Sequence, residues 1–319
     1  MSKILITGGA GQLGSALAAK LAEDAHNQIV IVDNLSTGKH YKIPKHPHVH
    51  FINADVNDYQ DVVPIFGRFD FDYVFHYAAV VGVKRTLEHP ISVLKDIEGI
   101  KNVLMLSKNS GVKRVFYASS SEVYGEPFEL PQNENTTPLN SRLPYAIVKN
   151  VGEAFFRSYQ KEYGLDYTIF RFFNTYGPHQ SEDFVIPRFV RAALCNAPLT
   201  IHGAGAQTRS FCYIDDTVDT CIKALQEDTF VNEVLNVGNH LEISILELAH
   251  KIIDVCNSKS EVVRLPALKE GDMQRRCPDN SRMKALLGRE LVDLETGLER
   301  LVSYYQQTTL DRYKVKSEK

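Results

Sequence analysis

Two short stretches of the chain place hydroxyl, carboxylate and amine groups at spacings that suit proton transfer. The stretch "ASSSEVYGE" (118–126) holds three consecutive serines and a glutamate, and "PYAIVKN" (144–150) holds Tyr145 and Lys149. On a helix, residues four apart lie on one face. A free tyrosine has a pKa of about 10 and is a poor base at pH 7, but a neighbouring ammonium favours the phenolate. We therefore expect Tyr145 to exchange a proton with a substrate hydroxyl that Ser120 also contacts.

A second group of residues has the composition of a phosphate-binding turn. The stretch "TGGAGQLG" places Gly8, Gly11 and Gly14 between a strand-like run and a helical one. Glycines permit the tight turn and the close approach of the backbone to a pyrophosphate, which then lies at the helix N-terminus. The spacing is GxxGxxG, and its position between strand and helix predicts a dinucleotide site in which Gln12 and Leu13 take part.

The end of the next strand-like run, "VDNLSTG", indicates which dinucleotide is bound. Asp33 stands where a carboxylate accepts hydrogen bonds from the adenosine ribose, and its charge repels a 2′-phosphate, so the sequence predicts NAD and not NADP. Asp55 is expected near the adenine amino group, and small residues at 78 and 79 let the cofactor pass close by. Besides the glycine turn and Asp33, the predicted contacts with the cofactor are Asn34, Asp55, Val56, Ala78, Ala79, Tyr145 and Lys149.

Apolar runs that alternate with helical patterns predict the elements that hold these residues. Segments 90–109 and 145–163 carry apolar residues at three- and four-residue spacing, as helices do. Near-continuous apolar strands separated by helices indicate an α/β fold of the Rossmann type, with a doubly wound parallel sheet. All strands of such a sheet end at one edge, where ligands bind. The predicted strands are 3–7, 28–33, 49–56, 72–79, 113–120 and 166–174.

After Asn174 the alternation loosens, which predicts a smaller, mostly C-terminal lobe for the substrate. There Ser244 and Glu247 have the spacing of a capping box at a helix start. We expect an NAD-binding Rossmann domain of residues 1–176 and 211–240, and a nucleotide-sugar-binding domain of residues 177–210 and 241–319.

Nearly the whole chain resembles the extended short-chain dehydrogenase/reductase family, in its group of NAD-dependent nucleotide-sugar epimerases and dehydratases. The segments that carry the resemblance are "TGGAGQLG", "VDNLSTG", "VFHYAA", "SSSEVYG", "YAIVK", "RFFNTYGP", "QTRSFCYIDD" and "GDMQRRCPD". The resemblance implies that Ser120, Tyr145 and Lys149 form a catalytic triad that oxidises a nucleotide sugar at C4. It also implies substrate contacts by Lys84, Ser121, Asn174, Arg209 and Arg276. Arginine forks suit the negative charges of a diphosphate.

Enzymes of this group differ in what the transient 4-keto sugar does next, and Glu122 bears on that choice. Dehydratases resemble "TDEVYG", whereas this chain has Ser121 at the aspartate position, and a serine is a poor proton donor to a leaving hydroxide. Glu122 and Arg276 stand at the positions of a Glu–Arg pair in UDP-glucuronate decarboxylases, but "YAIVKN" departs from the "YDEGKR" common there. We predict a 4-epimerase of nucleoside diphosphate sugars.

Four alternatives to the epimerase remain: a decarboxylase, a C4 dehydrogenase that releases the 4-keto sugar, and, less favoured, a 4,6-dehydratase or a non-catalytic NAD sensor. A structural role for Glu122, as a carboxylate that caps the nearby loop, also stays open beside the catalytic one.

Composition argues against several other classes of function. The 319 residues carry a net charge of −3 with mixed signs, so we expect no nucleic-acid partner. There is no apolar run of about 18 residues and no leader-like start, so we expect no membrane partner and a cytoplasmic protein. Five widely spaced cysteines without a CxxC pair, and a histidine series (His46, His48, His50) interrupted by Pro47, predict no metal site. Helices 90–109 and 145–163 carry more apolar residues than one buried face needs. In the family that the chain resembles, such helices pair between subunits, which implies a homodimer or larger homo-oligomer.

Overall fold

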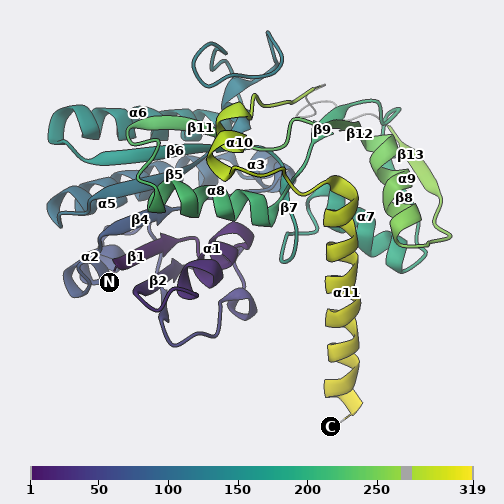
Figure 1. The fold of residues 1–319 in the computed structure, drawn as a ribbon, viewed down its shortest axis with the longest axis horizontal. Coiled ribbons are helices and arrows are strands. Elements are labelled where there is room, and N and C mark those ends of the chain that lie inside the picture. The colour runs from purple at the N-terminus through teal and green to yellow at the C-terminus, as the bar shows by residue number, and fades with distance from the viewer. Residues whose placement is uncertain (1, 267–274, 318–319) are drawn as a thin grey trace.

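A seven-stranded parallel sheet forms the centre of the molecule (Figure 1). The computed structural model describes residues 2–266 and 275–317, and among these the side chains of 83, 84 and 309–317 lie outside the description. The strands occur in the order β11-β6-β5-β4-β1-β2-β3. Their bounds are Ser2–Thr7 (β1), Asn27–Asp33 (β2), Val49–Asn53 (β3), Tyr73–His76 (β4), Arg114–Ser120 (β5), Asp166–Phe172 (β6) and Glu233–Val237 (β11).

The prediction of a Rossmann-type parallel sheet is confirmed, and all six predicted strands are present with different ends. β3 stops at Asn53 instead of residue 56 because side chains take over the backbone hydrogen bonds: the Asp55 N–H donates to Asp61 at 2.9 Å and the Asn57 N–H to Asp55 at 2.9 Å. β11 was not among the predicted strands. It pairs with β6 and completes one edge of the sheet.

Alternation along the strands produces two apolar cores, one on each face of the sheet. Ile4 and Ile6 of β1 belong to one core and Leu5 to the other, as the two-residue period of a strand requires. Helices α2 (Tyr59–Arg68), α5 (Asp96–Asn109) and α6 (Pro144–Tyr163) contribute to the core of Leu5, and α1 (Gln12–Ala22) and α8 (Ile214–Gln226) to the core of Ile4 and Ile6. The sheet is therefore covered on both faces.

Helix α6 has clear start and stop signals. Pro144 occupies its first turn, where its missing N–H costs nothing, and Gly164 ends it in the left-handed conformation with φ 72°. The other predicted helix, 90–109, is divided into α4 (Pro90–Leu94) and α5, with Lys95 between them. Short helical elements η1 (His40–Lys42), α3 (Val83–Glu88) and η2 (Ser121–Tyr124) lie in the connections on the carboxyl side of the sheet.

A smaller group of elements gathers at one end of the molecule in Figure 1, where β8, β13, α7 and α9 lie together. The capping box predicted at Ser244 and Glu247 is present at the start of α9. Besides the sheet strand β11 and helix α8, the elements that follow Asn174 are β7 (Thr175–Tyr176), α7 (Val185–Leu194), β8 (Leu199–His202), β9 (Thr208–Ser210), β10 (Cys212–Tyr213), β12 (Glu242–Ser244), α9 (Ile245–Val255), β13 (Val262–Leu265), α10 (Ser281–Leu287) and α11 (Leu294–Ser317).

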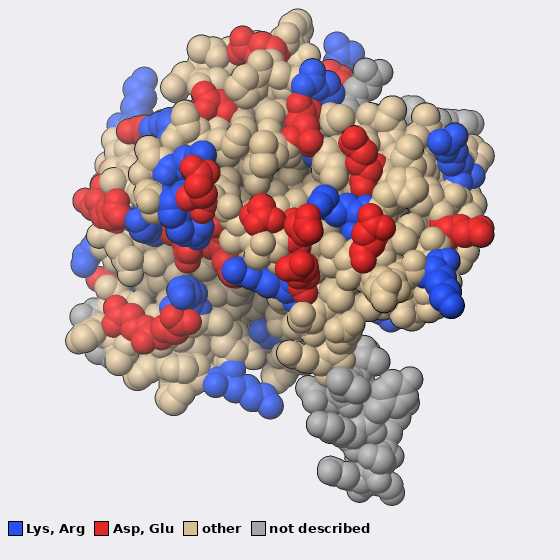
Figure 2. All heavy atoms as spheres, turned by 45° about the vertical axis from the view of Figure 1, so that its right-hand side comes forward, with Lys and Arg blue, Asp and Glu red and all other residues tan. Residues whose placement is uncertain are grey.

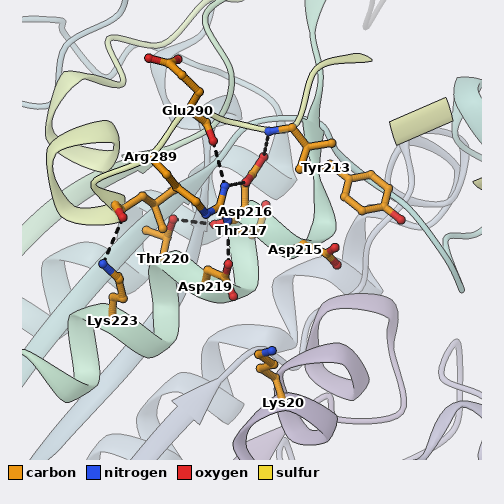
Figure 3. A network of polar contacts seen from close by, with 12 residues as sticks. Lys20, Tyr213, Asp215, Asp216, Thr217, Asp219, Thr220, Lys223, Arg289 and Glu290 are labelled. Atoms are coloured by element: carbon orange, nitrogen blue, oxygen red, sulfur yellow. Dashed lines mark hydrogen bonds and ion pairs between the residues drawn. The ribbon is translucent and has the colours of Figure 1, made fainter. Parts of the chain in front are cut away.

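A polar network fastens the segment between α10 and α11 to α8 (Figure 3). The Arg289 guanidinium donates to Asp216 at 2.5 Å and to Asp219 at 2.6 Å, and the Val292 N–H donates to Asp216 at 2.8 Å. Because the Asp216 side chain is fully buried, it needs these partners to offset the loss of water. The network fixes where the C-terminal helix leaves the body of the protein.

Candidate active site

A cleft of about 390 Å³ follows the carboxyl ends of the parallel strands, which is where the sequence predicts the ligands to bind. Most of the predicted site residues line it. They are Gly8, Gly11, Gln12, Leu13, Gly14, Asp33, Asn34, Asp55, Val56, Ala78, Ala79, Ser120, Ser121, Glu122, Tyr145, Lys149, Asn174 and Arg276. Residues predicted to bind the cofactor and residues predicted to transfer protons are far apart in the sequence but thus share one cavity.

The glycine turn between β1 and α1 leaves no room for side chains. Gly8 has φ +71°, and a Cβ placed there would lie 2.6 Å from the Ala78 nitrogen. A Cβ at Gly14 would lie 2.5 Å from the Gly8 carbonyl oxygen. The backbone at Gly11 lines the cleft directly before α1, so that the N-terminus of this helix faces the cavity. This turn fits the pyrophosphate of a dinucleotide.

Asp33 ends β2 at the edge of the same cavity. Its carboxylate accepts hydrogen bonds from the Ala10 N–H at 3.0 Å and the Leu35 N–H at 2.8 Å. A carboxylate offers about four acceptor sites, so two remain for ribose hydroxyls. Asn34 beside it donates to Asp55 at 3.1 Å, which links the two acidic positions predicted near the adenosine.

Tyr145 and Lys149 lie one turn apart on α6, beside the end of β5. The Lys149 ammonium donates to the Ala118 carbonyl at 2.7 Å and lies 5.7 Å from the centre of the Tyr145 ring. Ser120 hydrogen-bonds to Tyr145, and its Oγ accepts the Glu122 N–H at 3.2 Å, which caps η2. The structure therefore brings together the three residues predicted for proton transfer.

Burial dominates the pKa values in this group. It raises the pKa of Tyr145 above its ordinary value; the negative charge of Glu122 raises it further, and the hydrogen bond with Ser120 lowers it. Burial lowers the pKa of Lys149 to about 8, against the opposing charge of Asp96. Burial and the charge of Glu122 thus oppose the phenolate, whereas the hydrogen bond with Ser120 and the charge of Arg276 favour it.

Glu122 and Arg276 form an ion pair inside the cleft. The Arg276 Nη1 donates to the Glu122 carboxylate at 2.9 Å, and the two side chains are 8% and 20% exposed, respectively. Next to them the Ser121 hydroxyl is buried, and none of the described residues hydrogen-bonds to it. The pair joins η2 to a segment 154 residues further along the chain. The adjacent Arg275 instead pairs with Glu242 on the exposed side.

The outcome differs among the remaining predicted substrate residues. Arg209 lies on β9 and donates to the Thr208 carbonyl at 2.7 Å, and it does not line the cleft. Lys84 lies on α3, and its side chain is outside the described residues. Asn174, by contrast, lines the cleft, and its amide donates to the Ser210 carbonyl at 3.0 Å.

Sequence reasoning missed Asp96, which lines the cleft at the start of α5. Its carboxylate accepts the Val80 N–H at 2.7 Å. Burial raises the pKa of Asp96, while the charge of Lys149 works in the opposite direction. A lone aspartate in an amphipathic helix is typical of a solvated position, so the sequence gave no signal for this buried role.

The mouth of the cleft is bridged by residues that the sequence did not indicate either. Arg85 of α3 pairs with Asp183 at 3.4 Å, and the Lys42 ammonium donates to the His179 carbonyl at 2.7 Å. All four line the cavity. The loop that follows β7 thereby contacts both the α3 region and the segment after β2, across the predicted path of the cofactor.

Three observations describe the charge and composition of the described residues. On the face that Figure 2 shows, lysine and arginine side chains are interspersed with aspartates and glutamates and form no broad basic area among the coloured residues. Within 2–266 and 275–317, no helix is long and apolar enough to cross a membrane. No group of three or more potential metal ligands was found in the same described part of the chain.

Comparison with known proteins identifies the relatives of this chain. The model of the NAD dependent epimerase/dehydratase family matches residues 4–238. A UDP-glucuronic acid decarboxylase of Danio rerio is 36% identical over 96% of this chain and 73% of its own length. A UDP-N-acetyl-alpha-D-glucosaminuronate decarboxylase of Bacillus cytotoxicus is 35% identical over 97% of this chain and 99% of its own.

A solved structure gives the same answer for the fold. The UDP-glucose 4-epimerase of Thermotoga maritima, crystallised with UDP-glucose, has a TM-score of 0.91 and 32% identity, over 96% of this chain and 99% of that one. The chain therefore belongs to the NAD-dependent epimerase/dehydratase family.

Proposed function

We propose that this protein binds a nucleoside diphosphate sugar beside NAD and oxidises the sugar reversibly at C4. The observation that carries the proposal is the meeting of Ser120, Tyr145 and Lys149 in one cleft with the glycine turn of β1 and α1. Neither the glycine turn nor the three proton-transfer residues, taken alone, would distinguish this enzyme from an NAD-binding protein without catalysis. Relatives that act on UDP sugars support the same substrate class.

Tyr145 takes the proton of the C4 hydroxyl in the oxidation and returns a proton to O4 in the reduction. NAD, when bound, supplies the acceptor and donor for the hydride of C4. Ser120 contacts Tyr145 and is placed to orient the same oxygen. Lys149, fixed by the Ala118 carbonyl, supplies a positive charge next to the ring of Tyr145. Because burial raises the pKa of this phenol, Tyr145 depends on nearby positive charge to act as a base near neutral pH.

Epimerisation at C4 is the first candidate for the complete reaction. It needs no acid–base group beyond Tyr145 and Ser120, because the hydride returns to C4 on the other face of the ketone and the proton returns to O4. Ser121 stands where a dehydratase requires a carboxylic acid, and its hydroxyl is a weak acid, so loss of water is disfavoured. Ser121 is instead assigned to the sugar, since its buried hydroxyl lines the cleft and lacks a partner among the described residues.

Decarboxylation is the second candidate, and the ion pair of Glu122 and Arg276 favours it. A uronate that is oxidised at C4 is a β-keto acid, which loses carbon dioxide readily. Arg276 offers a fork for the sugar carboxylate, and Glu122 lies close enough to Tyr145 to affect its pKa. Relatives with 35–36% identity carry this activity in their names.

One experiment separates the candidates. The purified protein is incubated with UDP-glucose, UDP-N-acetylglucosamine or UDP-glucuronate, and the products are analysed by liquid chromatography and mass spectrometry. An isomer of unchanged mass indicates epimerisation, loss of carbon dioxide indicates decarboxylation, and loss of two hydrogens indicates release of the 4-keto sugar. A protein that binds NAD but converts no nucleotide sugar, including GDP-, dTDP- and CDP-linked ones, refutes the proposal.

We further propose the domain division of residues 1–176 and 211–240 for NAD, and 177–210 and 241–319 for the sugar nucleotide. The place of β11 in the central sheet supports the assignment of 211–240 to the first domain. All five cysteines are free, which supports a cytoplasmic location.

A homodimer is the assembly that we propose. Apolar side chains are exposed on α4 and α6: Ile91 is 69%, Leu94 40% and Ile147 41% exposed. Burying these residues against a second copy would be favourable at about 25 cal/mol per Å². Light scattering after size-exclusion chromatography tests this, and a monomer at micromolar concentration would contradict it.

A further inference from the structure

A buried asparagine joins the two segments that carry Glu122 and Arg276. Asn236 of β11 is fully buried, and its Oδ1 accepts the Tyr124 hydroxyl at 2.7 Å. Tyr124 is the last residue of η2, the short helix that contains Glu122. Asn236 therefore holds the end of that helix from below the cleft.

The amide nitrogen of Asn236 reaches the other segment. It donates to the Gln132 carbonyl at 2.9 Å and to the Asp279 carbonyl at 3.4 Å. Gln132 in turn bonds on both sides to the segment that follows Arg276: its N–H donates to the Cys277 carbonyl at 2.8 Å, and its carbonyl accepts the Asp279 N–H at 2.8 Å. The backbone directly after Arg276 is thus fixed to the same point as η2.

The same network is tied to the helix that carries Tyr145. Arg171 of β6 donates to the Tyr124 hydroxyl at 2.9 Å, and it forms a buried ion pair with Glu153 of α6 at 2.7 Å. Glu153 also accepts the Ser119 hydroxyl at 2.7 Å, one residue before Ser120. Arg171, Glu153, Tyr124 and Asn236 are buried and do not line the cleft, whereas Ser119 is buried at its wall.

We infer that Asn236 is a positioning residue: with Tyr124 it sets the distance and orientation of the Glu122–Arg276 pair relative to Tyr145. The inference rests on the proposed function, because it assigns these contacts to the reaction. Neither Asn236 nor Tyr124 lines the cleft, so both act through the pair and not on the sugar. A hydrogen-bonded asparagine suits this place, because one side chain accepts from one segment and donates to the other.

The test is a double-mutant cycle with Tyr124→Phe and Glu122→Gln, measured with the nucleotide sugar that the parent enzyme converts. Tyr124→Phe removes one hydroxyl and keeps the ring that packs against Phe173. We expect it to lower kcat about tenfold, as the loss of a buried hydrogen bond allows, with NAD affinity unchanged within about twofold. In the Glu122→Gln background the same change should have less than about a twofold effect, because its target is already disabled.

The control is Tyr167→Phe, which removes the hydroxyl of another tyrosine in the core and keeps its ring. Tyr167 lies on β6, hydrogen-bonds to Arg157 and does not line the cleft. If Tyr124→Phe slows the enzyme no more than Tyr167→Phe, or slows the Glu122→Gln enzyme by the full tenfold, the positioning role is wrong. If the parent protein converts no nucleotide sugar, the proposed function is refuted, and the link between Tyr124 and Glu122 is tested by stability instead. The urea midpoints of Tyr124→Phe, Glu122→Gln and the double variant are then compared. Additive shifts overturn the link, and non-additive shifts support it.

Discussion

Replacing Gly8 by alanine should abolish tight NAD binding, and the structure contains the control that isolates the reason. Gly8 and Gly111 have the same φ of +71°, a conformation that costs an alanine about 1–2 kcal/mol. At Gly111 a Cβ would meet nothing within 4 Å, so this conformational cost is all that Gly111→Ala should show. At Gly8 the Cβ would lie 2.6 Å from the Ala78 nitrogen, which is shorter than the ordinary contact distance of 3.4–4 Å.

The backbone of Gly8 or Ala78 must therefore move by about 0.8 Å or more, the difference between 3.4 and 2.6 Å. Displacements of about 1 Å at a binding site cost up to about a hundredfold. Isothermal titration with NAD should show at least a tenfold loss of affinity for Gly8→Ala and less than about twofold for Gly111→Ala. Urea unfolding checks that both variants are folded. Equal affinities for Gly8→Ala and the parent would refute the reasoning that this turn holds the pyrophosphate.

Three further substitutions test the catalytic residues and the network beneath them. Tyr145→Phe should lower turnover by about 10²–10⁴ in a steady-state assay while NAD stays bound; a rate near that of the parent would remove Tyr145 as the base. Glu122→Gln should move the rising limb of the pH–rate profile to lower pH, because the charge of Glu122 adds to burial in raising the pKa of Tyr145; a limb that stays in place or moves upward contradicts this. Glu153→Ala should lower the unfolding free energy by about 3–5 kcal/mol in urea titrations, because it leaves Arg171 charged and buried. Glu98→Ala, which breaks an exposed pair, should cost less than about 1 kcal/mol.

The parallel sheet was predictable because each of its first six strands is a near-continuous apolar run. β11 escaped prediction because it has five residues, begins with an exposed glutamate and pairs with β6 from far along the chain. The strand ends at Asn53 and His76 were missed for a local reason: the side chains of Asp61 and Thr7 accept the N–H groups of Asp55 and Ala78, which would otherwise have continued the ladder.

The site was predictable where motif spacing fixes geometry, as it does for the glycine turn and for Tyr145 and Lys149 on one helix. Prediction failed where the tertiary structure decides. No pattern in the sequence indicates that Asp96 is buried beside the cleft or that Arg276, and not Arg275, turns toward Glu122. The effect of burial on the pKa of Tyr145 does not follow from spacing, because burial depends on every element that packs around it.

The position of β11 has a consequence for biosynthesis. A ribosome completes β6 at Phe172 long before it reaches Glu233, where β11 begins, so the nascent sheet has an unpaired edge during that interval. Five of the seven residues of β6 are buried in the finished protein, and an unpaired strand edge readily pairs with other chains. The edge of β6 is therefore a site where the growing polypeptide can aggregate until β11 has emerged. A gene fragment that stops before Glu233 should yield aggregates and not a smaller NAD-binding protein.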